Sequence, residues 1–195
     1  MNKTHYALVF VLLGVAILVG SFFSQPPQTT AQAANKQATT NEQPTASGRM
    51  PSPPREGENI RLDFPIKDMT DAVRNIKEWQ GKILVLNFWA TWCGPCRHEI
   101  PAFNAIQKKY AQRNVQFLGL AYDDKAAISR FTSIIPVDYP ILYGDEEVMD
   151  LSIEYGNLQA ILPFTVFVNS HGKVFHIAEG ALTEQATESI LTKAL

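Results

Sequence analysis

The sequence contains two cysteines, Cys93 and Cys96, and they follow closely on an apolar run at residues 83–90. Asn87 is the single polar residue in that run (ILVLNFWA). A short apolar run without alternation is typical of a central strand that is covered on both faces. Apolar residues then recur at helical spacing over residues 100–110. The cysteine pair is therefore predicted to lie where a buried strand passes into a helix, and this placement constrains both the fold and the chemistry.

The rest of the domain alternates between strand-like and helix-like segments. Further strands are predicted at residues 115–121, 139–142 (a short edge strand), 164–168 and 173–177. Helices are predicted at residues 100–110, 125–134 and 145–155, and after Thr183, which can cap a last helix. Alternation of this kind implies a parallel sheet core with right-handed crossovers, extended by antiparallel strands. The predicted fold class is α/β, with a central mixed sheet flanked by helices.

The start of a helix favours redox chemistry at the cysteine pair. Unpaired N–H groups and the positive end of the helix dipole lie there, and such settings lower the pKa of a cysteine from about 8.5 to roughly 3.5–7.5. Pro95 fits the first helical turn, because a proline there costs no hydrogen bond. Cys96 lies one turn further in and is expected to be more buried. Cys93 is thus predicted as the exposed, attacking thiol, and Cys96 as the thiol that resolves the mixed disulfide.

Other uses of the cysteine pair fit the sequence less well. Covalent haem attachment needs a histidine directly after the second cysteine, where Arg97 stands. A zinc site would need two further ligands, and the four histidines show no paired spacing. An inert disulfide would close only a tiny loop and would constrain little of the unfolded chain. We therefore expect redox catalysis through Cys93 and Cys96, with no metal and no cofactor.

Residues 1–23 are predicted to form a membrane anchor or signal. Residues 6–23 contain no charged residue, and a helix of about 18 residues spans about 27 Å, close to the hydrocarbon core of a bilayer. Lys3 and the amino terminus are the nearby positive charges, so the amino terminus is expected in the cytoplasm and the rest of the chain outside. A cleaved signal peptide and a buried soluble helix are the alternatives.

Residues 24–59 are predicted to form a flexible linker. They are rich in Gln, Thr, Ala, Asn and Pro, and they show no hydrophobic periodicity that could order them. The remaining residues, 60–195, have the length of one domain. The whole chain has 17 Lys and Arg residues against 19 Asp and Glu residues, and this balance argues against nucleic acid as a partner.

At the cysteine pair the sequence resembles the thioredoxin superfamily. Residues 88–96 (FWATWCGPC) are similar to its active-site segment almost letter for letter, and Pro101 falls where the family kinks its first helix. Residues 161–165 (ILPFT) resemble the family's cis-proline loop. The resemblance implies a cis Pro163 beside the cysteines and a Leu162 backbone that pairs with a bound substrate strand. The residues expected to contact substrate are Trp92, Gly94, Pro95, Leu162 and Pro163.

Residues 87–93 (NFWATWC), together with the predicted anchor and linker, narrow the resemblance to the TlpA/ResA-like envelope branch. Members of that branch are disulfide reductases outside the cytoplasmic membrane, and they serve cytochrome c maturation, the assembly of oxidase copper sites or related thiol upkeep. The resemblance therefore implies protein thiols and disulfides as substrates. It also implies a membrane electron donor of the thiol-conduit type, because a reductase in an oxidising compartment needs its own supply of electrons.

One position departs from cytosolic thioredoxins. They have a buried aspartate where this chain has Asn87, and an amide cannot take up the proton that leaves Cys96 when it attacks. Glu99 lies three residues after Cys96 on the same helix face, and it is the candidate replacement. Burial near the thiols would raise the pKa of Glu99 and suit it to general base catalysis. The alternative is a solvated glutamate, and Arg97 and His98 are also expected to be solvated.

Three other functions are compatible with the same fold. An oxidase or isomerase would use the same cysteine pair at a less negative redox potential. A thiol peroxidase would need a peroxide-activating arginine beside a lone thiolate, and Arg97 is the adjacent arginine in the sequence. A copper-binding or copper-transfer module would use both thiols as ligands.

Overall fold

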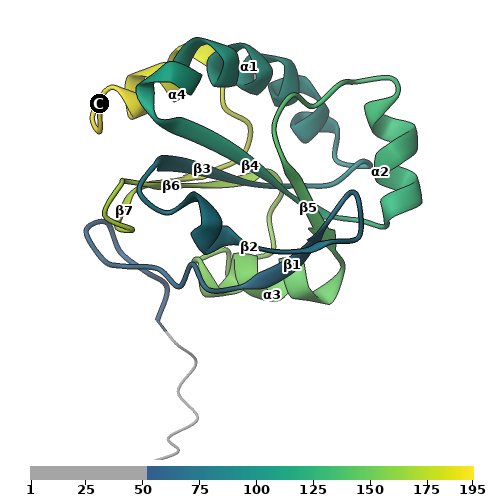
Figure 1. Ribbon diagram of the computed structural model, residues 1–195, viewed down its shortest axis with the longest axis horizontal. Coiled ribbons are helices and arrows are strands. Elements are labelled where there is room, and N and C mark those ends of the chain that lie inside the picture. Colours follow the sequence, from purple (N-terminus) through teal and green to yellow (C-terminus); the bar gives the residue numbers. More distant parts are fainter. Residues whose placement is uncertain (1–51) are drawn as a thin grey trace, which may run out of the picture. The chain divides into compact units, whose positions relative to one another are not determined.

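The structure, a computed structural model, describes residues 52–195. Its strands are β1 (Pro65–Asp68), β2 (Val73–Asn75), β3 (Ile83–Trp89), β4 (Val115–Tyr122), β5 (Ile141–Gly144), β6 (Phe164–Val168) and β7 (Val174–Glu179). Its α-helices are α1 (Gly94–Tyr110), α2 (Lys125–Thr132), α3 (Glu146–Glu154) and α4 (Glu184–Leu191). Two short 3-10 helices are η1 (Ile76–Trp79) and η2 (Ala111–Arg113). The seven strands form one sheet in the order β2-β1-β5-β4-β3-β6-β7 (Figure 1).

The sheet has a parallel centre and antiparallel flanks. β3 pairs with β4, and β4 with β5, in parallel, whereas β6 and β7 extend the other side of β3 in antiparallel fashion. All seven residues of β3 are buried. Because both faces of β3 are covered, its apolar run needs no alternation with polar residues. The mixed α/β sheet predicted from the sequence is thereby confirmed.

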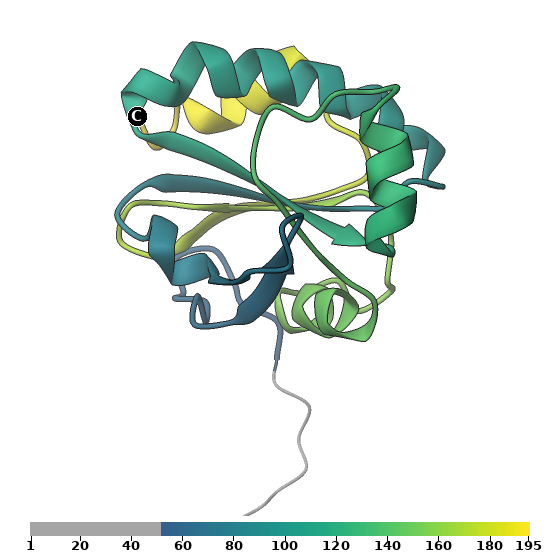
Figure 2. The same ribbon diagram turned by 45° about the vertical axis from the view of Figure 1, so that its right-hand side comes forward.

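Helices cover both faces of the sheet. Figures 1 and 2 show α1 and α4 on one face and α3 on the other. Leu84 and Leu86 of β3 share a buried cluster with Leu151 of α3, whereas Val85 shares a cluster with Phe103 of α1. Successive side chains of β3 point to opposite faces, so the strand is held by both helical layers. Its carboxyl end, from which the cysteines follow, is therefore fixed in place.

The predicted edge strand at residues 139–142 is wrong in its position in the sheet. The observed strand, β5, lies between β4 and β1, and the edges are β2 and β7. β5 is internal because β1 pairs with it on its outer side. No prediction was made for β1, which has four residues, of which only Ile66 is buried. So short and polar a strand shows no hydrophobic pattern.

The segment before β1 pairs with β7. The Gly57 N–H donates to the Val174 carbonyl at 2.7 Å, and the Val174 N–H donates to the Glu58 carbonyl at 2.9 Å. The linker predicted from the sequence, residues 24–59, includes these residues. Their backbone hydrogen bonds instead attach this segment to the sheet.

The other N-terminal predictions concern residues that the structure does not describe. The anchor at residues 1–23 and the linker as far as residue 51 lie outside the described residues. Within residues 52–195, no helix combines the length and the apolar character that a membrane span requires.

Gly119 of β4 provides a test of the packing beside the site, because it pairs with Asn87 of β3. A Cβ atom at this position would lie 2.9 Å from Trp89 Nε1 and 3.2 Å from Tyr139 Cε2, and both rings are buried. We expect Gly119→Ala to lower the free energy of unfolding by about 1–3 kcal/mol, as overpacking does. Urea unfolding measures this change. Gly94→Ala is the control, since a Cβ there meets nothing within 4 Å; equal losses in both variants would contradict the prediction.

Candidate active site

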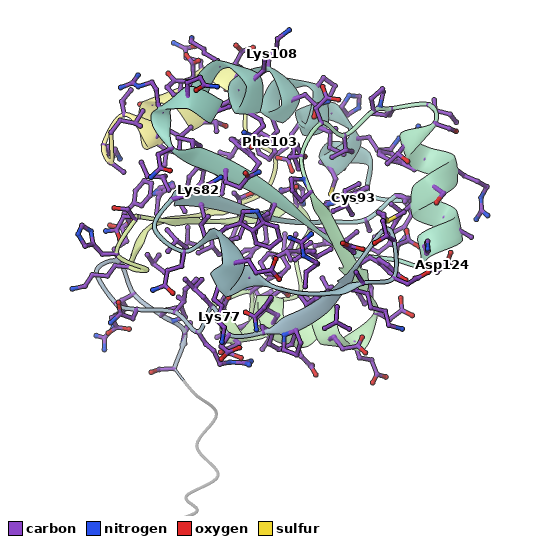
Figure 3. The ribbon with its side chains drawn as sticks, viewed as in Figure 1. Lys77, Lys82, Cys93, Phe103, Lys108 and Asp124 are labelled. Atoms are coloured by element: carbon purple, nitrogen blue, oxygen red, sulfur yellow. A yellow bond between two sulfur atoms is a disulfide. The ribbon has the colours of Figure 1, made fainter. Side chains whose placement is uncertain are left out.

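The cysteine pair lies at the amino end of α1, directly after β3 (Figure 3). Cys93 is the N-cap residue of α1, and a disulfide bond joins it to Cys96. The Cys96 N–H donates to Cys93 Sγ at 3.2 Å, so this sulfur occupies the place of a capping oxygen. In the reduced protein, the same N–H and the helix dipole favour the thiolate of Cys93. Pro95 lies in the first turn, as the sequence predicts.

The two sulfurs differ in access in the predicted order. Cys93 is 5% exposed and Cys96 is fully buried. Cys93 is less exposed than expected, because it belongs to a buried cluster with Trp89, Ala121 and Ile128 of α2. Cys93 is nevertheless the more exposed of the two, as expected, and the roles of the two thiols stay a prediction.

Glu99 is buried one turn beyond Cys96 on α1, at 2% exposure. Asn87 Nδ2 donates to Glu99 Oε1 at 2.8 Å, and the Leu182 N–H donates to Oε2 at 3.0 Å. Asn87 Nδ2 also donates to Thr165 Oγ1 at 3.1 Å. The structure therefore places Glu99 in the interior and not on a solvated helix face. The carboxyl group is held between α1, β3 and the loop that precedes α4.

Burial raises the pKa of Glu99 to about 7, from an ordinary value of 4.5. The loss of hydration is the main cause, because an apolar environment disfavours the charged carboxylate. The hydrogen bonds from Leu182 and Asn87 act in the opposite direction and lower the pKa. The Glu99 carboxyl can therefore accept or release a proton near neutral pH, which is the range that general base catalysis requires.

Three buried polar atoms among the described residues have no hydrogen-bond partner: Asn87 Oδ1, Trp89 Nε1 and the Tyr139 hydroxyl oxygen. Burial raises the pKa of Tyr139, and the negative charge of Glu99 raises it further, so this hydroxyl stays neutral. Asn87 is important because it contacts Glu99 directly. Its amide has a donor already in use and an acceptor that is not in use, so it can also accept a hydrogen bond.

The Leu162–Pro163 peptide bond is cis, as the resemblance implies. The Asn157 side chain holds the preceding residue, because its Oδ1 accepts from the Ile161 N–H at 2.9 Å and its Nδ2 donates to the Ile161 carbonyl at 2.8 Å. The Pro163 carbonyl accepts from the Gly180 N–H at 2.8 Å. Leu162 packs against the cluster that contains both cysteines. Within residues 52–195, the main-chain N–H and C=O of Leu162 have no hydrogen-bond partner.

The other residues expected to contact substrate lie on the surface around the disulfide. Trp92 is 66% exposed, and its indole meets the Tyr122 ring edge to face, with 6.5 Å between ring centres. Gly94 and Pro95 are exposed at the start of α1. Arg97 and His98 are also exposed, as predicted. The cysteines, Glu99 and Pro163 thus form the buried part of the site, Leu162 is half-buried, and the substrate contacts stay a prediction.

Two contributors to the site were not predicted from the sequence. Leu182 acts through its main-chain N–H, which leaves no trace in the residue type. Thr165 is a polar residue in an otherwise apolar strand, β6 (FTVFV), and that pattern was a usable signal. Its pairing with Asn87 across β3 and β6 requires knowledge of the register.

The site has no arrangement typical of a metal centre. In the part of the chain that the structure describes, no group of three His, Cys, Asp or Glu side chains is placed to hold a metal ion. The two cysteines are bonded to each other, and a tetrahedral zinc site would need further ligands beside them.

The Redoxin family model matches residues 56–195, and the chain belongs to the Redoxin family. The thiol-disulfide oxidoreductase ResA of Halalkalibacterium halodurans is 28% identical over 138 residues, which cover 70% of this chain and 76% of the relative. The thioredoxin-like protein YneN of Bacillus subtilis is 29% identical over 66% of this chain and 75% of the relative.

A solved structure from Chlorobium tepidum, assigned as the thiol:disulfide interchange protein DsbE, has the same fold. Its TM-score is 0.66 at 24% identity, and the match covers 72% of this chain and 98% of that chain. This likeness confirms the thioredoxin-like fold. Family membership and the relatives, together with the Cys93–Cys96 pair, support protein thiol–disulfide oxidoreductase activity.

The raised pKa of Glu99 predicts how stability depends on pH. Between pH 4.5 and pH 7 the Glu99 carboxyl binds more protons in the folded protein than in the unfolded chain, so its contribution to stability falls as the pH rises. One pKa unit corresponds to about 1.4 kcal/mol. We expect Glu99 to reduce the free energy of unfolding by on the order of 3 kcal/mol across this range.

Glu99→Gln isolates this contribution, because the amide cannot lose a proton. Urea unfolding of both proteins, with the disulfide intact, should show a difference that shifts in favour of the variant as the pH rises from about 4.5 to about 7 and that is constant above this range. The matched control is Glu146→Gln, since Glu146 is exposed on α3. A constant difference between wild type and Glu99→Gln at all pH values would show that folding does not raise the pKa of Glu99.

Proposed function

We propose that this Redoxin-family protein reduces protein disulfides outside the cytoplasmic membrane, through the Cys93/Cys96 dithiol and with Glu99 as general base. The observation that carries this proposal is the buried carboxyl of Glu99, placed one turn beyond Cys96 and with a pKa of about 7. A structural disulfide has no need of such a group, whereas the resolving step of a reductase needs a proton acceptor.

The first step takes place at Cys93. In the reduced protein its thiolate attacks one sulfur of the substrate disulfide, which breaks the S–S bond and releases the other substrate sulfur as a thiolate. A mixed disulfide now joins Cys93 to the substrate. The free main-chain groups of Leu162 support this step, because they can pair with an extended substrate segment beside the cysteines.

The second step takes place at Cys96. Glu99 accepts the Cys96 proton, and the Cys96 thiolate attacks Cys93 Sγ. This attack forms the Cys93–Cys96 disulfide and releases the second substrate thiolate, so that two electrons have passed to the substrate. Cys96 is fully buried, and bulk water therefore has little access to its proton. A nearby base is therefore needed to accept this proton.

The amide of Asn87 suits a base that changes its charge. Its Nδ2 donates to the ionised Glu99 carboxylate, and a flip of the amide would let Oδ1 accept from the protonated carboxyl. A second buried carboxyl at this position would repel the first and raise its pKa further. Asn87 therefore acts as a positioning residue for Glu99 in both protonation states.

The proposed place of the reaction and the proposed partners rest on the sequence and its resemblance to the TlpA/ResA-like branch. The apolar run at residues 6–23 would anchor the chain in the cytoplasmic membrane, with the domain outside. The oxidised pair would be reset by a membrane electron donor of the thiol-conduit type, which receives electrons from cytosolic thioredoxin. By the resemblance to the TlpA/ResA-like branch, substrates would be apocytochrome c or the copper-ligand cysteines of an oxidase.

Glu99→Gln should slow resolution of the mixed disulfide and leave its formation unchanged. Loss of a general base costs about 10²-fold or more in rate. Rapid acid quenching and mass spectrometry of the reduced protein with a disulfide peptide would follow both steps. In wild type the resolution rate should rise with pH through about 7, and in Glu99→Gln this rise should disappear. Glu146→Gln is the matched control.

Identical resolution kinetics in Glu99→Gln and wild type from about pH 5 to pH 9 would remove Glu99 from the mechanism.

The direction of the reaction has its own test. A redox titration that placed the Cys93/Cys96 pair among strong oxidants would contradict a reductase. Tight copper binding by the reduced protein, without any disulfide reduction, would favour a copper module.

The proposed location is tested on intact cells. Full-length protein expressed in a bacterial host should react at Cys93 with a membrane-impermeant maleimide after mild reduction, without lysis. Cys96→Ser keeps Cys93 as the single thiol and simplifies the readout, and a cytoplasmic cysteine protein serves as the lysis control. Labelling of Cys93 only after lysis would contradict the outward-facing domain.

A further inference from the structure

A surface pocket of about 320 Å³ opens at the amino end of α1, and it is lined by Gly94, Arg97, His98 and Ile135. Gly94 directly follows Cys93, so the pocket borders the first cysteine. The first turns of α1 supply three of the lining residues, and the segment after α2 supplies Ile135. No step of the mechanism above uses this pocket.

Arg97 brings a positive charge to the pocket without a partner of its own. Among residues 52–195, no carboxylate oxygen lies within 4.0 Å of its guanidinium. The group lies instead 5.9 Å from the centre of the Phe131 ring. A cation near the start of a helix is unfavourable because it faces the positive end of the dipole, and α1 has no acidic residue in its first turn. The charge of Arg97 is therefore available to a ligand.

Acidic residues close to the cysteines in the fold are used elsewhere. Asp123 accepts a hydrogen bond from the Thr91 N–H at 3.2 Å. Asp124, at the start of α2 (Figure 3), caps that helix by accepting from the Ala127 N–H at 2.8 Å. Glu99 is turned into the interior. None of the three forms an ion pair with Arg97.

Apolar surface adjoins the pocket. Ile134 is 78% exposed, and it is the neighbour of Ile135 in the pocket wall. Together with Ile135, this exposed side chain gives the pocket an apolar rim, and apolar contacts beside a charged group are typical of protein interfaces. A small free anion would interact with Arg97 alone and would make no contact with the apolar surface.

We propose that this pocket binds an acidic side chain of the substrate protein, close in sequence to the cysteine that Cys93 attacks. The inference rests on the proposed function, because it names the class of disulfide that the reductase prefers. The planar guanidinium of Arg97 pairs with the Asp or Glu carboxylate, and Ile134 contacts the adjoining apolar part of the substrate. Disulfides flanked by acidic residues are therefore the preferred substrates.

The experiment compares two disulfide peptides that differ at one position beside the attacked cysteine, Asp in one and Lys in the other. The second-order rate constant for mixed-disulfide formation with the reduced protein is measured for each peptide. Wild type should prefer the acidic peptide by about fivefold at low salt, the upper range for an exposed ion pair. The preference should fall as salt is added.

Arg97→Gln should bring the ratio of the two rate constants close to one, and Arg97→Glu should invert it. Either change also alters the field at Cys93, but a change in thiolate reactivity affects both peptides equally and cancels in the ratio. Lys108→Glu is the matched control, since Lys108 is an exposed cation in the last turn of the same helix (Figure 3). It should keep the wild-type ratio.

The outcomes separate this inference from the proposed function. Fast reduction of both peptides at equal rates, in wild type and in Arg97→Glu alike, would overturn the charge-selective pocket and leave the reductase standing. A preference that Lys108→Glu weakens as much as Arg97→Glu does would reveal a general charge effect and would also overturn it. Failure to reduce either peptide would contradict the proposed function itself.

Discussion

The burial of one carboxyl group is the constraint on which the rest of the site depends. Glu99 has lost nearly all contact with water, and hydrogen bonds from Asn87 and Leu182 only partly offset that loss. Hydrogen-bond partners from elements that are distant in the sequence hold the carboxyl group in this position. The helix that carries it also begins at Cys93. The fold thus couples the placement of a proton acceptor to the placement of the thiol pair.

The scaffold achieves this coupling through β3. The strand is covered by helices on both faces, and its middle contributes Asn87 while its end leads to the cysteines. The cis-proline loop before β6 and the loop before α4 converge on the same end of the sheet. Loops that are held by a rigid sheet can keep reactive groups in place while they remain open to partners.

Much of the fold could be predicted from the sequence, because β3, α1, β4 and the closing hairpin have strong hydrophobic patterns. β1 could not, since Ile66 is its one buried residue. Without β1, the sequence predicts β5 as an edge strand. A local signal for η1 was present in Asn75 and Glu78, which form a capping box. In the site, the cysteines and Glu99 were visible in the sequence. The Leu182 N–H was not, since main-chain contacts depend on tertiary structure alone.

The hydrogen bonds that Gly57 and Glu58 form with Val174 determine where the segment before β1 joins the sheet. They lie beside the hairpin that joins β6 to β7, and Val168 at the end of β6 pairs with Leu84 near the beginning of β3. Cys93 follows the opposite end of β3, roughly 20 Å away at the rise of an extended strand. Residues 57 and 58 therefore join the sheet at the end opposite the cysteines, and a partner protein can reach Cys93 without contacting this segment.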